Sequence, residues 1–260
     1  MSLLTSSNTD YHANRSHLSS SNLKMLLKDP AQFKREWIDG IREPQVDKPA
    51  FMEGTLTHSL ILEPETILDY AVYPGLRKAG NAWEEFKLAN PDKKLVSITQ
   101  MQRAERMFKS YSGMSTAVNL VKNGVAEHTM LGKIYDVSLK ARADYIVPKQ
   151  YIVDVKTTAM PSDADIFRQT VEDYGYHTSA ALYCELAKQT YGVEHDFYWL
   201  VLSKEDNGCH VYKAGDSLIQ GRLLVEKAVA LYKQCLRTGV WQLEQPKQSF
   251  DSETYEIVEI

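Results

Sequence analysis

Two adjacent strand-like segments, residues 139–147 and 151–158, constrain the fold most strongly, because they carry charges inside otherwise apolar sequence. Successive side chains of a strand point to opposite faces. In the first segment one face is expected to hold Lys140, Arg142 and Asp144, and the other Leu139, Ala141, Ala143 and Tyr145. In the second segment Asp154 and Lys156 share a face. A short turn at residues 148–150 predicts that the segments pair, which brings Asp144 close to Asp154 and Lys156.

Two carboxylates and an ammonium group at the end of a sheet are suited to phosphodiester hydrolysis. Oxygen ligands of this kind favour magnesium or manganese over zinc. A hard cation polarises a phosphoryl oxygen and lowers the pKa of a bound water, and a lysine can orient that water or offset developing charge. The alternative is a structural ion pair on a solvated sheet face, which is the commoner role of an Asp-x-Lys pattern in a strand. The triplet by itself leaves both interpretations open.

The composition predicts one folded unit. The chain has 260 residues, 43% hydrophobic and 25% charged, which is enough to build one substantial core. No apolar run approaches the roughly 20 residues that cross a bilayer, and the N-terminus lacks the pattern of a signal peptide, so we expect a cytoplasmic protein without a membrane partner. Cys184, Cys209 and Cys235 are widely spaced and odd in number, which argues against a disulfide framework.

The net charge of −4 is unfavourable for a nucleic-acid partner, because affinity for phosphates comes chiefly from Lys and Arg. An acidic metal site would subtract from the total, so the distribution of basic residues matters more than the sum. The candidates for a basic cluster near the site are Arg77, Lys78, Lys140, Arg142, Lys149, Lys156 and Arg168. Arg77 and Lys78 precede an expected helix and could hold a phosphate at its N-terminus, or could form a solvated loop.

Two further residues have an ambiguous sequence context. His58 lies on an expected helix over residues 50–62, on the face that also carries its apolar residues, where a hydrogen-bonded core histidine is the usual finding. Glu127 lies in an expected strand over residues 125–131 and shares a face with Thr129 and Leu131. Its apolar neighbours do not explain a charge at that position, although an exposed edge strand would.

The order of five motifs resembles the exodeoxyribonuclease VIII (RecE-type) nucleases, in the RecB-like branch of the PD-(D/E)xK superfamily. The motifs are Gly54-Thr-x-x-His58, Ala126-Glu127, Arg142-Ala-Asp144, Asp154-Val-Lys156-Thr-Thr158, and Tyr176-His177 with Tyr183. The resemblance spans most of the chain, from Leu18 to the strand that begins at Phe197. The sequence departs from the family pattern at Ala143, where the superfamily name has proline, and at Ser179, where this branch usually has glutamine.

The resemblance implies a fold and a domain division. The fold is α/β, with a central mixed β-sheet flanked by helices and an N-terminal helical lobe. Residues 1–260 would form a single nuclease domain: a helical part over the site at about 1–120, a catalytic core at about 121–240, and a tail at 241–260.

The resemblance also implies residue roles. The implied metal ligands are His58, Glu127, Asp144, Asp154 and the carbonyl of Val155. Lys156 would position or activate the attacking water, as a catalytic residue together with the three acids. The implied DNA contacts are Arg77, Lys78, Arg142 and Tyr183, with Tyr183 on a helix that borders the site.

By the same resemblance, the expected activity is magnesium-dependent degradation of double-stranded DNA from its ends, with manganese as a substitute. The 5′ to 3′ direction, a ring-like homo-oligomer and a single-strand annealing recombinase as partner are expected as in phage-type recombination. The alternatives are a repair or restriction-like endonuclease of the same superfamily, and a non-catalytic DNA-binding module. The presence of Asp144, Asp154 and Lys156 together favours a catalytic protein.

Overall fold

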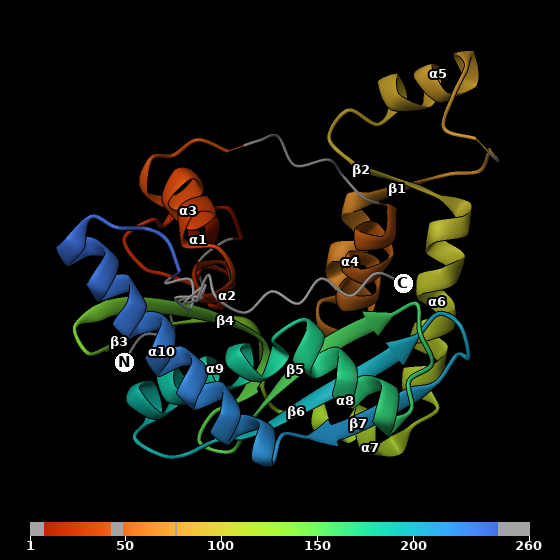
Figure 1. Cartoon of the computed structure of the whole chain (residues 1–260). Helices are drawn as coiled ribbons and strands as arrows, with labels where there is room; N and C mark the ends of the chain where they lie inside the picture. The colour runs from red at the N-terminus through yellow and green to blue at the C-terminus, as the bar shows by residue number, and fades with distance from the viewer. Residues whose placement is uncertain (1–7, 43–48, 76, 244–260) are drawn as a thin grey trace, which may run out of the picture.

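A five-stranded mixed sheet forms the centre of the protein (Figure 1). The computed structural model describes residues 8–42, 49–75 and 77–243, so most of the expected tail lies outside the described residues. The strand order is β3-β4-β5-β6-β7, in which only the β5–β6 pair is parallel. The strands are β3 (Val125–Ile134), β4 (Val137–Val147), β5 (Tyr151–Thr158), β6 (Asp196–Ser203) and β7 (Cys209–Lys213). The predicted mixed sheet is confirmed.

Connection lengths explain the strand directions. β3 and β4 are joined by Tyr135 and Asp136, both with positive φ, which suits a tight hairpin between antiparallel strands. A parallel pair needs a longer crossover, and between β5 and β6 the crossover contains α8 (Ala164–Asp173) and α9 (Tyr176–Tyr191).

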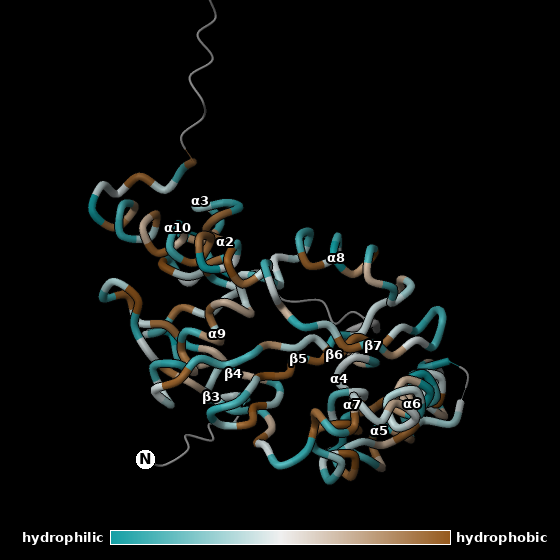
Figure 2. Tube along the Cα trace, turned by 90° about the horizontal axis from the view of Figure 1, so that it is seen from below, coloured by the Kyte–Doolittle hydropathy of each residue, from teal (hydrophilic) through white to brown (hydrophobic). Residues whose placement is uncertain are grey.

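Helices cover both faces of the sheet (Figure 2). On one face, α9 and α10 (Asp216–Thr238) pack with the N-terminal helices around a first core, which includes Leu23, Leu139 and Phe197. On the other face, a second core includes Tyr111, Val153 and Leu200. The N-terminal elements on the first face are α2 (Ser20–Lys28), α3 (Pro30–Phe33) and the π-helical turn η1 (Lys34–Ile38), whereas α1 (Asn8–Ala13) contacts β4 through Tyr11 and Lys140. Those on the second face are α4 (Pro49–Leu62), α6 (Ile98–Ser112) and α7 (Ser115–Leu120).

The helical N-terminal part is therefore present but divided over the two faces of the sheet. The apolar side chains of α2, including Leu23 and Leu26, belong to the first core, whereas Ile61 of α4 belongs to the second. Beyond α4 lies a smaller unit with a parallel pair of strands (Figure 1). It consists of η2 (Pro64–Asp69), β1 (Tyr70–Tyr73), α5 (Asn81–Ala89) and β2 (Lys94–Ser97).

One predicted strand face is wrong. Leu139, Ala141 and Ala143 pack in the first core as expected, but Tyr145 packs in the second core on the opposite face. Regular alternation is interrupted between Ala143 and Tyr145, where the neighbouring strand carries Glu127 in a left-handed backbone conformation with φ of 51°. This irregularity shifts the side-chain alternation by one residue.

Two predictions from composition can be compared with the structure. All three cysteines are free thiols, in agreement with the absence of a disulfide framework. Among residues 8–42, 49–75 and 77–243, no helix combines the length and apolar character required to cross a membrane.

Candidate metal centre

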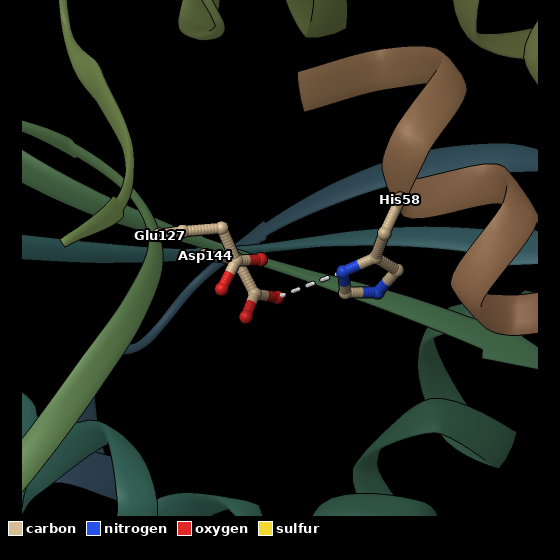
Figure 3. Close-up of side chains that lie close together, drawn as sticks. All are labelled: His58, Glu127 and Asp144. Carbon is tan, nitrogen blue, oxygen red and sulfur yellow. Dashed lines mark ion pairs between the residues drawn. The ribbon is translucent and has the colours of Figure 1, made fainter. Parts of the chain in front are cut away.

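Three potential metal ligands converge from three elements: His58 of α4, Glu127 of β3 and Asp144 of β4. One donor atom from each lies within 4.8 Å of the others. Figure 3 shows the imidazole of His58 reaching from α4 towards the two carboxylates, with its Nδ1 3.7 Å from Oδ2 of Asp144. Their side chains are between 18% and 28% exposed, so a small ion can reach the group from solvent.

The position of Asp144 depends on a local separation of β4 from β5. Backbone pairing between these strands ends at Tyr145–Val153, whereas β5 continues to pair with β6 up to Thr158. The amide of Val155 donates instead to Oδ2 of Asp144, at 2.8 Å. This side-chain hydrogen bond satisfies a backbone donor that would otherwise lack a strand partner, and it fixes the carboxylate at the separation between the strands.

His58 is oriented by β5. Its Nε2 lies 2.9 Å from the carbonyl oxygen of Val155. A carbonyl can only accept, so Nε2 carries the hydrogen, and in the neutral ring Nδ1 is then an acceptor. Nδ1 and the Asp144 carboxylate thus face one another as two acceptors, an arrangement that a shared cation stabilises. A second partner that fixes the tautomer is typical of metal-binding histidines.

Close packing of α4 on β5 makes this contact possible. A Cβ added at Gly54, one helical turn before His58, would lie 3.1 Å from Oγ1 of Thr157. Residues four apart lie on the same face of a helix. The missing side chain at Gly54 therefore lets the His58 face of α4 approach β5.

A buried carboxylate also anchors α4. Glu53 is 4% exposed and accepts from Nη1 of Arg103 at 2.7 Å, and its other oxygen lies 2.8 Å from Nζ of Lys204. Burial alone would raise the pKa of Glu53, but the hydrogen bonds from Lys204 and Arg103 lower it below its usual value. Glu53 thereby ties α4 both to α6 and to the segment after β6.

The backbone conformation and the surroundings of Glu127 are both energetically unfavourable. Its positive φ is uncommon for a residue with a side chain, and such strain is concentrated at functional sites. Burial and the charge of Asp144 raise the pKa of Glu127, although its ion pair with Arg142, at 2.5 Å, acts in the opposite direction. Two acids forced together in this way fit a site completed by a divalent cation.

The buried Asp154 and the partly exposed Lys156 form an ion pair beside this group. Burial raises the pKa of Asp154, despite the opposing charge of Lys156. The pKa of Lys156 is raised by the charges of Asp154 and Asp144, which outweigh the effect of burial. The Lys156 ammonium also lies 4.9 Å from the centre of the Tyr176 ring. Asp154 is thus near Asp144 but outside the group of three potential ligands.

The remaining predicted residues are in different surroundings. The Val155 carbonyl contacts His58, and its role as a direct ligand stays a prediction. Tyr183 of α9 is electrostatically coupled to Asp154 and Asp144, but its hydroxyl is buried, which raises its pKa well above the usual value. Arg142 touches the site through Glu127.

Arg77 and Lys78 do not lie with this group. They connect β1 to α5, in the unit that extends away from the five-stranded sheet (Figure 1). Nζ of Lys78 donates to the carbonyl of Leu95 at 3.1 Å and lies 5.6 Å from the Trp83 ring. The expectation that these two residues cluster near the site is therefore wrong, and their role as DNA contacts stays a prediction.

Sequence reasoning assigned no role to Lys24 and no specific role to Tyr176. Lys24 of α2 donates to the carbonyl of Tyr174 at 3.2 Å and lies 6.0 Å from the Tyr176 ring, which it shares with Lys156. A Cβ at Gly175 would come within 2.8 Å of the Lys24 side chain. The sequence around Lys24 does not predict this contact, because it depends on the path of a segment 150 residues away.

Comparisons with known proteins concern the fold and the family of the chain. The crystal structure of a protein from Eubacterium rectale, described as a candidate exonuclease, matches all of this chain and 96% of its own, with a TM-score of 0.66 and 18% identity. This likeness shows a shared fold. The crystal structure of SSO0001 covers 72% of this chain and 88% of its own, at a TM-score of 0.31 and 12% identity, too weak to support an argument.

No curated protein sequence matches the chain significantly. Residues 19–249 match the family described as a PDDEXK-like domain of unknown function (DUF3799). The matched region includes all five strands of the sheet and all the potential metal ligands. The chain belongs to this PDDEXK-like family.

Proposed function

We propose that the protein is a magnesium-dependent deoxyribonuclease that degrades double-stranded DNA from its ends. The observation that carries the proposal is the convergence of His58, Glu127 and Asp144 beside the Asp154–Lys156 ion pair. A structural ion pair on a solvated face would not require two carboxylates and an acceptor nitrogen within 4.8 Å. Membership of a PDDEXK-like family supports the same chemistry.

The potential metal ligands are proposed to act together on one divalent cation. We propose that His58, Glu127 and Asp144 hold a divalent cation, and that Asp154, which lies outside this group of three, contributes a further oxygen ligand. When bound, the cation supplies positive charge for the phosphate and lowers the pKa of water. The oxygen ligands suit magnesium, and the histidine makes manganese a good substitute.

Lys156 is positioned for a role in the chemical step. Its ion pair with Asp154 and its contact with the Tyr176 ring restrict the ammonium group to one side of β5. A charge fixed before reaction stabilises developing negative charge without reorganisation. We infer that Lys156 orients the attacking water or balances charge on the phosphate.

Dependence on DNA ends is the finer part of the proposal. It is supported by the resemblance to RecE-type nucleases, as are the 5′ to 3′ direction, the ring-like homo-oligomer and an annealing recombinase partner. These features are proposed together, because a ring that encloses duplex DNA requires an end to load.

Linear and covalently closed forms of one plasmid test the proposal. With magnesium, the linear form should be consumed from its ends while the closed circle remains intact. Cleavage of the circle would instead identify an endonuclease of the same superfamily. Binding without hydrolysis of either form, in magnesium and in manganese, would identify a non-catalytic DNA-binding module.

A further inference from the structure

A connected series of cations and aromatic rings leads away from the metal centre along β4 and the N-terminal helices. It starts at Arg142, whose Nη2 is 2.5 Å from Glu127, and whose guanidinium carbon is 5.6 Å from the Tyr11 ring of α1. Nζ of Lys140 lies 4.5 Å from the centre of the same Tyr11 ring and 5.9 Å from the centre of the Trp37 ring of η1. We name this series the cationic track: Arg142, Tyr11, Lys140, Trp37, Arg15 and Arg42.

The track ends in two exposed arginines placed around one ring. The guanidinium carbons of Arg15 and Arg42 lie 4.9 Å and 5.6 Å from the Trp37 ring. Stacking on an aromatic ring restricts a guanidinium group and leaves its edge available for a planar anion. Trp37 therefore holds two positive charges in fixed positions at the surface.

Few carboxylates neutralise this region. Among ion pairs between described residues, Arg142 is paired with Glu127, and none involves Arg15, Arg42 or Lys140. Lys140 is 3% exposed, and its ammonium group donates to the carbonyls of Tyr11 and Asn14 instead.

The positive charges in this region also lower the pKa values of two neighbouring histidines. Burial lowers the pKa of His12, and the charges of Arg142, Lys140 and Arg42 lower it further. The pKa of His17 is lowered by burial and by Lys140 and Lys133. Positive charge is therefore concentrated around the cationic track, although the net charge of the whole chain is −4.

We propose that the exposed end of the cationic track, formed by Arg15 and Arg42, binds phosphates of the nucleic-acid backbone at a distance from the metal centre, while the buried Lys140 adds to the positive potential. This inference rests on the proposed nuclease function and identifies the surface that receives its substrate. A guanidinium group carries five N–H donors, and phosphate accepts two in parallel. Contacts between described residues use only Nη2 of Arg15 and Nε of Arg42, both directed to backbone carbonyls of η1.

Continuity with the metal centre favours nucleic acid over another anionic partner. The carboxylate that contacts Arg142 is itself a potential metal ligand. A polyanion whose backbone lies along the track would thus present a phosphodiester at the group formed by His58, Glu127 and Asp144. The competing interpretation is structural: Arg15 and Arg42 would serve only to satisfy the carbonyls of Glu36 and Trp37.

The double variant Arg15→Gln/Arg42→Gln separates these interpretations. Binding of a labelled DNA duplex, with calcium in place of magnesium, is measured by fluorescence anisotropy over a series of salt concentrations. Losing two phosphate contacts should weaken binding roughly tenfold and reduce the slope of log affinity against log salt by about 2. In magnesium, KM for linear duplex should rise while turnover at saturating DNA stays unchanged.

The matched control is Arg106→Gln/Arg222→Gln, which removes the same charge from exposed positions on α6 and α10. Melting temperatures of all variants show whether the fold is kept. If the double variant unfolds, Arg42→Gln alone removes a single hydrogen bond to Glu36 and should lower the salt slope by about 1.

Two outcomes overturn the inference. A salt slope and KM equal to those of the control contradict it, and so does a lower melting temperature with an unchanged salt slope, which would establish the structural role. These results differ from failure of the proposed function. In that case the unmodified protein would neither bind nor hydrolyse DNA, whatever residues occupy positions 15 and 42.

Discussion

Glu127 lies opposite Asp144 in the ladder between β3 and β4, at a position where backbone pairing is interrupted. The flanking pairs are Ala126–Tyr145 and His128–Ala143. The left-handed conformation of Glu127 thus coincides with the shift in side-chain alternation, and the two carboxylates meet there with His58. Backbone strain and charge repulsion are both concentrated at the candidate metal centre, where a cation would compensate for them.

Metal binding should release a proton from Glu127. Burial and Asp144 raise the pKa of Glu127, so between its usual and raised values the metal-free site holds a proton that a cation must displace. Affinity for manganese should therefore increase with pH through this window. Calorimetry in two buffers of different ionisation enthalpy measures the release. Equal proton release by the wild type and Glu127→Gln would show that another group titrates.

His58→Ala distinguishes a metal ligand from a core histidine. The side chain is 28% exposed and its Nδ1 faces Asp144, so we expect loss of metal-dependent hydrolysis with little change in metal-free melting temperature. Manganese affinity should fall as well. A large fall in melting temperature, with activity per folded molecule preserved, would instead show that His58 has a structural role through its hydrogen bond to the Val155 carbonyl.

Lys156→Ala should affect turnover more than affinity. Removing a fixed charge close to the reacting phosphate typically costs about 10²–10³-fold in rate. Single-turnover kinetics at saturating DNA measure this step, and Lys188→Ala on the exposed part of α9 is the control. Weaker DNA binding with turnover unchanged would make Lys156 a phosphate contact.

Glu53→Gln should destabilise the fold by about 3 kcal/mol, because it breaks a buried pair and leaves Arg103 and Lys204 without their carboxylate. The lowered pKa of Glu53 means that its ionic contribution is present above its unfolded pKa and is lost as pH falls through the folded value. The difference in urea stability between wild type and variant should therefore shrink at acid pH. A pH-independent difference would exclude an ionic cause. Asp165→Asn, at an exposed pair, should change stability little.

Local sequence patterns predicted the elements but not their long-range contacts. Alternation within residues 139–143 and 151–158 correctly predicted two paired strands with Asp144 near Asp154, because strand periodicity is a local property, but it failed at Tyr145. The strand pairing is interrupted at Glu127 because this residue adopts a left-handed backbone conformation. The residues around Glu127 in the sequence did not predict that conformation. The wrong placement of Arg77 and Lys78 has a similar cause, since the path of the chain after β1 is set by packing on α4 and α6.

The cationic track illustrates the same limit. Tyr11 and Trp37 lie in α1 and η1, and Arg15 and Arg42 lie in the segments that follow these elements. No local sequence period connects the four residues to Lys140 and Arg142 of β4. Only the packing of α1 and η1 against β4 shows that these residues meet Lys140 and Arg142.

Hydrolysis of end-labelled linear duplex DNA by the wild type and Asp144→Asn tests the metal-centre assignment most directly. Asparagine can still accept the hydrogen bond from Val155, so the separation of β4 from β5 is preserved while the ligand charge is removed. We expect magnesium-dependent shortening by the wild type and none by Asp144→Asn, with equal melting temperatures in the absence of metal. Equal rates for the two proteins in magnesium, or no hydrolysis by the wild type in either magnesium or manganese, would contradict the assignment.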